Sequence, residues 1–104
     1  MDSNKKLKIQ NNVLRRMIKE VKHYDKELKL NEEILNKMNL EGKDKYDIKK
    51  QMELVEESKI MVSYSNKLLD KEKEKLETIL NDVSEDPNLD YNLINDSESI
   101  FNSL

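Results

Sequence analysis

Residues 44–82 read DKYDIKKQMELVEESKIMVSYSNKLLDKEKEKLETILND, and their apolar side chains recur with a spacing of seven. The unbroken line runs one residue beyond this stretch and consists of Ile48, Val55, Val62, Leu69, Leu76 and Val83. A heptad repeat of this length is typical of one long helix that packs along a neighbouring helix. We therefore expect a single helix from about Asp44 to about Asp82, with a bend near residues 63–66, where helix propensity is lowest.

The preceding segment carries a second heptad pattern. One line consists of Leu7, Leu14, Val21, Leu28 and Leu35, and the line beside it consists of Gln10, Met17, Tyr24, Asn31 and Met38. This pattern predicts a helix from about Lys5 to about Leu40, in which Tyr24 fills the core and Asn31 fixes the register. Gly42 then ends the helix, because glycine adopts the left-handed conformation without strain, and the short turn makes the two helices antiparallel.

The C-terminal segment predicts a third, shorter helix over about residues 87–103. Asp86 is the expected N-cap, with Pro87 in the first turn. Residues 84–104 carry five acidic and no basic side chains, whereas residues 1–23 carry seven basic and two acidic ones. Because short turns make neighbouring helices antiparallel and these charges are opposite, we expect the third helix to start near the N-terminus of the first and to pack along its first half.

The composition supports an all-helical fold. The chain has 104 residues with a single Gly and a single Pro, too few turn residues for a sandwich, a barrel or repeated βαβ units. The sequence therefore predicts one all-α domain: an antiparallel three-helix bundle that forms an elongated, coiled-coil-like rod with two long helices and a shorter C-terminal helix.

The sequence lacks residues that several classes of function require. The chain has no Cys, one His and no Gly-rich phosphate loop, so we expect no enzyme activity, no cofactor and no metal site. No stretch resembles a secretory signal or a membrane span, which indicates a soluble intracellular protein without membrane contact. The net charge of −3 and the 5% aromatic content argue against nucleic-acid binding.

Protein contact is the class that remains. Basic residues recur on the outer face of the first helix at Lys8, Arg15, Lys22 and Lys29, and at Lys5, Lys19 and Lys26. This basic face is either a docking surface for an acidic partner or an ordinary solvated helix face. The two heptad lines through Leu7 and Gln10 form the seam along which the first helix packs. Leu30 lies off this seam and is a candidate for apolar contact with a partner, although single exposed leucines are common.

Two separated motifs carry a family resemblance. The first helix contains LKI at 7–9, VLRRMIKE at 13–20 and YDKE at 24–27, and the second contains YDIKKQ at 46–51, followed by Glu53, Glu57, Ser58 and Met61. In sequence and in separation these motifs resemble the tubulin-specific chaperone A family, also called tubulin-folding cofactor A. The resemblance covers about Leu7 to Leu80.

The resemblance implies a cytoplasmic, cytoskeleton-associated, non-enzymatic chaperone. Such a protein would bind and stabilise monomeric β-tubulin after chaperonin release and pass it toward αβ-tubulin assembly with other tubulin-folding cofactors, acting as a monomer rather than a dimer. The contact residues carried over by motif are Arg16, Lys19 and Lys26 on the first helix and Asp47, Lys49, Lys50 and Glu57 on the second. Ile48 and Tyr24 belong to the same motifs but are better explained as core. The competing hypothesis is a generic helical adaptor or a self-associating coiled coil.

Overall fold

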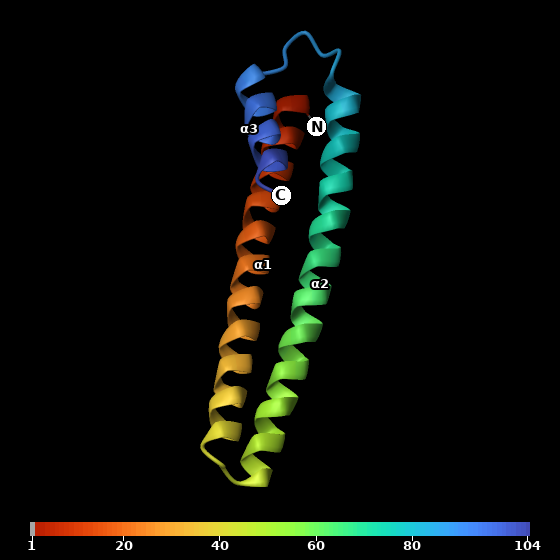
Figure 1. The fold of residues 1–104 in the computed structure, drawn as a ribbon. Helices are drawn as coiled ribbons and strands as arrows, with labels where there is room; N and C mark the ends of the chain where they lie inside the picture. The colour runs from red at the N-terminus through yellow and green to blue at the C-terminus, as the bar shows by residue number, and fades with distance from the viewer. Residues whose placement is uncertain (1) are drawn as a thin grey trace. The chain divides into compact units, whose positions relative to one another are not determined.

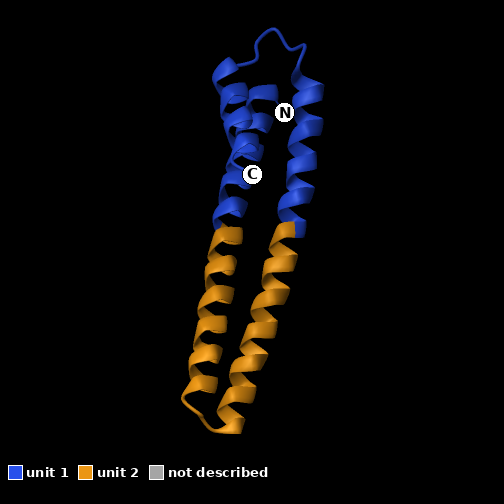
Figure 2. Ribbon diagram, in the orientation of Figure 1, with its two compact units in different colours: residues 1–19, 67–104 blue, residues 20–66 orange. Residues whose placement is uncertain are grey.

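The computed structural model describes residues 2–104, and these residues form three helices without a strand (Figure 1). Helix α1 spans Ser3–Leu40, α2 spans Lys45–Val83 and α3 spans Tyr91–Asn102. The chain divides into two compact units (Figure 2). The three-helix unit comprises the chain up to Lys19 together with Lys67–Leu104, and the two-helix unit comprises Glu20–Asn66.

Gly42 ends α1 in the manner that the sequence predicts. Its φ of 64° is the left-handed value that glycine adopts without strain. The N–H of Lys43 donates to the carbonyl of Met38 at 3.0 Å, and the N–H of Gly42 donates to that of Asn39 at 3.3 Å. This pair of bonds is a Schellman motif, which satisfies carbonyls that the helix end would leave unpaired.

The three-helix unit contains the apolar core. Its buried side chains come from all three helices and from the segment before α3, and they are Leu7, Leu14, Leu76, Val83, Leu89 and Ile100. Leu7, Leu14 and Leu76 have no exposed surface at all. A buried polar pair also joins α3 to α1, since the Ser97 hydroxyl donates to Asn11 Oδ1 at 2.7 Å. The predicted packing of the third helix along the first half of α1 is therefore confirmed.

The start of α3 differs from the prediction. The helix begins at Tyr91 rather than near Pro87, and its N-cap is Asp90, whose side chain accepts a hydrogen bond from the N–H of Asn92 at 2.9 Å. Asp86, the expected cap, instead closes a separate turn before the helix.

A contact distant in sequence explains this shift. The Asn4 side chain accepts a hydrogen bond from the N–H of Asp90 at 2.7 Å and donates one to the carbonyl of Asn88 at 2.9 Å, so α1 binds the backbone of the connecting segment. Asp86 caps its own turn by accepting from the N–H of Asn88 at 2.9 Å. That bond, reinforced by one from the Ser3 side chain, holds the pKa of the Asp86 carboxyl below its usual value.

The two-helix unit has a different interior. Among the described residues of this unit, Val55 is the one buried apolar side chain, at 5% exposure, and the other buried positions are Gln51, Ser58 and Ser65. These three polar residues also lie seven apart, on the line beside Ile48, Val55 and Val62. Asn31 of α1 donates to the Ser58 hydroxyl at 2.8 Å, and Gln51 donates to the Asn31 carbonyl at 3.0 Å. The predicted place of Asn31 in the seam is confirmed.

Helix α2 continues without interruption through residues 63–66. The Ser65 hydroxyl and the Asn66 amide both donate to the carbonyl of Val62 at 3.0 Å, which gives this carbonyl partners outside the regular helical pattern. Such side-chain bonds to the preceding turn often accompany a change in helix direction. The boundary between the two units also falls here, after Asn66, and a bend at this point stays a prediction.

Candidate partner-binding surface

The two-helix unit leaves its seam partly open. The apolar seam residues of α1 in this unit, Val21, Leu28 and Leu35, are only half-buried, as are Ile48 and Val62 of α2. Two helices alone cannot enclose an apolar stripe, because each side of the seam remains open to solvent. Apolar surface of the two-helix unit therefore remains accessible to solvent.

Most of the large apolar side chains that the structure exposes belong to this unit. They are Leu30, Ile34, Leu40, Tyr46, Met52, Leu54, Ile60, Met61 and Tyr64. Three of them, Leu30, Leu54 and Met61, line one hollow, and adjacent exposed apolar side chains are typical of a protein-binding surface, whereas scattered single residues are not.

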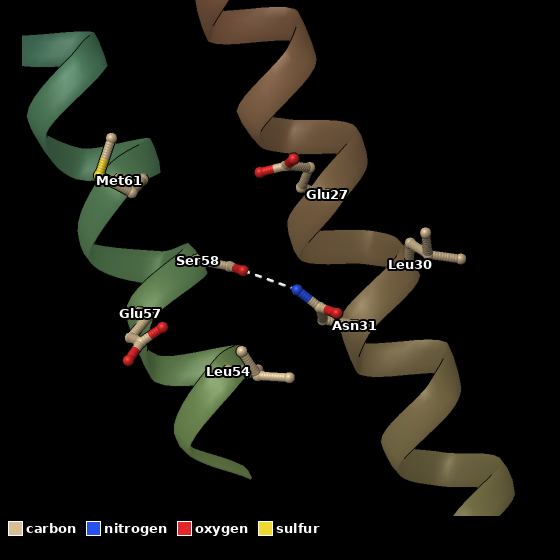
Figure 3. A pocket seen from close by; sticks show the side chains of 7 residues that line it. All are labelled: Glu27, Leu30, Asn31, Leu54, Glu57, Ser58 and Met61. Carbon is tan, nitrogen blue, oxygen red and sulfur yellow. Dashed lines mark hydrogen bonds between the residues drawn. The ribbon is translucent and has the colours of Figure 1, made fainter. Parts of the chain in front are cut away.

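A groove lies on this surface between α1 and α2, with a volume of about 350 Å³ (Figure 3). Its lining residues are Glu27, Leu30, Asn31, Leu54, Glu57, Ser58 and Met61. Leu54 and Glu27 are directed into the space between the two helices, and Leu30 lies on the outer edge of α1. The Asn31–Ser58 hydrogen bond crosses the groove. The groove thus combines apolar walls with a polar bridge whose members already have partners.

The charge at the groove is negative. Glu27 and Glu57 line it, and no Lys or Arg is among its lining residues. Nε2 of His23 lies 3.1 Å from Oε1 of Glu27, and both side chains are mostly exposed. Carboxylates beside an apolar strip favour a partner that presents both apolar and basic side chains.

The basic face of α1 is exposed, as the sequence predicts. Lys5, Lys8, Arg15 and Lys19 lie in the three-helix unit, and Lys22, Lys26 and Lys29 lie in the two-helix unit. Arg15 is partly engaged by α3, since its Nη2 lies 3.5 Å from Oδ2 of Asp96.

The structure places every candidate contact residue at an exposed position. Arg16 and Lys19 lie in the three-helix unit, whereas Lys26, Leu30, Asp47, Lys49, Lys50 and Glu57 lie in the two-helix unit. Leu30 and Glu57 come together at the groove. Lys49 and Glu57 border a second, shallower hollow on α2, and Nζ of Lys50 lies 4.6 Å from the centroid of the Tyr46 ring.

On the α2 side of the groove, Glu57 is among the contact residues predicted from the sequence, whereas Leu54 and Met61 are not. Leu54 and Met61 are seven apart, and Glu57 and Ser58 lie between them at helical spacing, so all four occupy one face. Leu54 and Met61 are visible in the sequence as an apolar line beside the one through Val55. Such a line is more typical of core packing than of a binding surface, so the sequence does not predict a contact stripe there.

Among residues 2–104, no group of three or more His, Cys, Asp or Glu side chains is arranged to hold a metal ion. None of the three helices is both long and apolar enough to cross a membrane. The surface described above consists of side chains that can bind a partner by burial and charge.

Comparison with known proteins identifies the family. Residues 2–100 match the family described as Tubulin binding cofactor A. The chain belongs to the tubulin binding cofactor A family. The resemblance inferred from the two motifs is therefore confirmed.

Individual members of the tubulin binding cofactor A family are similar over part or all of the chain. Proteins named Tubulin-specific chaperone A from Homo sapiens and Gallus gallus are each 43% identical over 58 residues, which cover 56% of this chain and 54% of the relative. The match therefore spans about half the length of these curated relatives. A solved structure described as human tubulin chaperone cofactor a covers 98% of this chain and 97% of its own, with a TM-score of 0.77 and 31% identity. The predicted all-α, three-helix fold is confirmed.

Proposed function

We propose that this protein is a tubulin chaperone that binds and stabilises monomeric β-tubulin after its release from the chaperonin, and passes it toward assembly of the αβ-tubulin heterodimer. The observation that carries the proposal is the match of residues 2–100 to the tubulin binding cofactor A family. Relatives named Tubulin-specific chaperone A support the role of chaperone.

The surface of the two-helix unit supports this function. A subunit without its partner exposes an interface that is normally buried, and a chaperone must cover apolar area without performing a reaction. The exposed apolar residues around Leu30 and Leu54 supply such area. Binding alone is sufficient for this task, so the proposal includes no cofactor and no catalytic step.

Charged residues beside the apolar surface would set orientation and encounter rate. The proposed contacts are Arg16, Lys19, Lys26, Leu30, Asp47, Lys49, Lys50 and Glu57, all exposed. The chain would act as a monomer in the cytoplasm, in association with the cytoskeleton, and transfer its cargo to other tubulin-folding cofactors.

Co-elution from a size-exclusion column tests the function directly. The chain should co-elute with free β-tubulin and not with the intact αβ heterodimer. Failure to bind free β-tubulin, or equal binding of the heterodimer, would refute the proposal. Sedimentation of the 12.4 kDa chain alone tests the competing function of a self-associating coiled coil, which requires a dimer or a larger assembly.

The contribution of the basic face can be measured separately. Replacing Lys19 and Lys26 with Glu should slow association with β-tubulin at low salt, and the effect should diminish as salt screens the charges. Replacing Lys67 and Lys71, two exposed lysines of α2, with Glu makes the same change in net charge and serves as the control. Equal rates for the two double variants would exclude a specific role of the basic face.

A further inference from the structure

We infer that the groove lined by Leu30, Leu54 and Met61 receives an amphipathic helix of the partner that carries Lys or Arg beside its apolar face. The inference rests on the proposed function in one respect only, since it places this helix in β-tubulin. Its chemical content, an apolar and basic helix in an acidic groove, can be tested without tubulin.

The groove has the geometry of a helix-binding site. On α1 the lining residues are Glu27, Leu30 and Asn31, which share one face at spacings of three and four. On α2 the lining residues Leu54, Glu57, Ser58 and Met61 repeat the same spacing. Two helical stripes that border one groove present alternating projections and gaps, into which the side chains of a third helix fit.

The three-helix unit shows what such a third helix achieves. Helix α3 has only 12 residues, yet the core to which it contributes Ile100 buries Leu7, Leu14 and Leu76 completely. In the two-helix unit, by contrast, Leu54 is 46% exposed to solvent and Leu30 is 56% exposed. A short amphipathic helix is therefore enough to enclose a pair of helices of this kind, and the groove has the apolar area to hold one.

The charge of the groove selects the occupant. Glu27 and Glu57 are the charged residues that line it, and the lining contains no Lys or Arg. Glu27 also lies 3.1 Å from Nε2 of His23, on the same helix and outside the lining. A second copy of this chain that docked with its own groove against this one would bring two more carboxylates to the interface, and like charges brought together are unfavourable. A helix with Lys or Arg flanking its apolar stripe would instead form pairs at both edges.

Two synthetic peptides provide the test. Both are amphipathic helices of about 14 residues, one built from Leu and Lys and the other from Leu and Glu at the polar positions. Each carries a fluorophore, and its binding to the full chain is followed by fluorescence anisotropy at low salt. The Leu-Lys peptide should bind, and the Leu-Glu peptide should bind at least about tenfold more weakly.

Variants of the chain locate the binding site. The double variant Glu27→Lys/Glu57→Lys should weaken binding of the Leu-Lys peptide by about tenfold or more. The matched control Glu32→Lys/Glu33→Lys changes the net charge equally at exposed positions outside the groove lining, and should weaken binding by less than about threefold. Equal losses in the two variants would show attraction to net charge alone and would overturn the inference.

The apolar part of the site is tested by Leu30→Ser/Leu54→Ser. Both side chains are about half exposed, so the helical content should be preserved, and circular dichroism verifies this. Binding of the Leu-Lys peptide should fall by about tenfold or more, as for residues central to an interface. Unchanged binding would contradict the inference. A dimer of the unmodified chain that this variant dissociates would also overturn it, since a second copy would then occupy the groove.

The same variants separate this inference from the proposed function. If β-tubulin binds the unmodified chain but binds Glu27→Lys/Glu57→Lys equally well, the inference is wrong and the chaperone function stands. If the Leu-Lys peptide occupies the groove but β-tubulin does not bind, the chaperone function is wrong and the groove chemistry stands. A photo-crosslinking amino acid in place of Leu54 should attach to a basic, amphipathic helix of β-tubulin, and attachment to a segment without Lys or Arg would contradict the assignment.

Discussion

Replacing Asn11 with alanine should destabilise the attachment of α3 to α1. Asn11 is 1% exposed and Ser97 is 0% exposed. The substitution removes the bond from the Ser97 hydroxyl to Asn11 Oδ1, at 2.7 Å, and the bond from Asn11 Nδ2 to the carbonyl of Leu93, at 3.1 Å. Each contributes about 1 kcal/mol net, and the space left by the missing side-chain atoms costs about 1 kcal/mol more. We expect Asn11→Ala to lower the free energy of unfolding by about 3 kcal/mol.

A double-mutant cycle isolates the interaction between the two side chains. Ser97→Ala alone should cost about 2 kcal/mol, because it leaves Asn11 Oδ1 buried without a donor. The double variant should cost about 1 kcal/mol less than the two single costs taken together, because their shared bond is lost only once. Urea unfolding followed by circular dichroism gives these values, and hydrogen exchange of the α3 amides reports whether this helix is released first.

An exposed asparagine on the same helix provides the control. Asn95→Ala should change the free energy of unfolding by less than about 0.5 kcal/mol, since Asn95 is exposed on α3. If the costs of Asn11→Ala and Ser97→Ala are additive, the two side chains do not act as a pair, and the account of how α3 is held is refuted.

Three further outcomes follow from single sites. Gly42→Ala should lower the free energy of unfolding by about 1 kcal/mol through backbone strain alone, because φ is 64° and a Cβ would meet no atom within 4 Å; thermal melting measures this, and no change would contradict it. Because the bond from Asn88 lowers the pKa of Asp86 in the folded state, the ionised carboxylate stabilises the fold. This stabilisation is complete above the unfolded pKa of about 3.9 and disappears as the pH falls through the lower folded value. The difference in Tm between the unmodified chain and Asp86→Asn should therefore be present at neutral pH and vanish in acid, and a difference independent of pH would exclude this origin. Leu76→Ala should cost about 2–5 kcal/mol, whereas Ile60→Ala should cost less than about 0.5 kcal/mol, since their exposures are 0% and 66%; similar losses in urea unfolding would show that the core is misassigned.

The long helices could be predicted because their signal is local. The spacing from Ile48 to Val83 repeats within one element, and Gly42 acts within one turn. The polar half of the α2 seam could not be recognised in this way. Gln51 and Ser58 are buried where Asn31 of α1 lies against them, and polar residues at heptad positions give no apolar signal.

The start of α3 and the groove depend on contacts distant in sequence. Asp86 and Pro87 form a reasonable helix start, yet the side chain of Asn4, more than 80 residues away, binds the following backbone, and the N-cap lies at Asp90 instead. The position of Leu30 off the heptad lines is enough to predict that its side chain is exposed. Its proximity to Leu54 and Met61 requires the register between α1 and α2, which no single helix specifies.

The heptad spacing on both sides of the Gly42 turn allows the two-helix unit to change length in defined steps. Suppose that seven residues were deleted from α1 together with the seven that face them on α2. The remaining residues of the two helices would then face the same partners as before, and the core around Leu76 would be unchanged. Asn31 and Ser58 form a hydrogen bond between α1 and α2. Deletions that keep the two helices in register preserve this bond, and deletions that shift the register break it. The length of the two-helix unit can therefore be changed in steps of seven residues while the residues that form the core of the three-helix unit stay as they are.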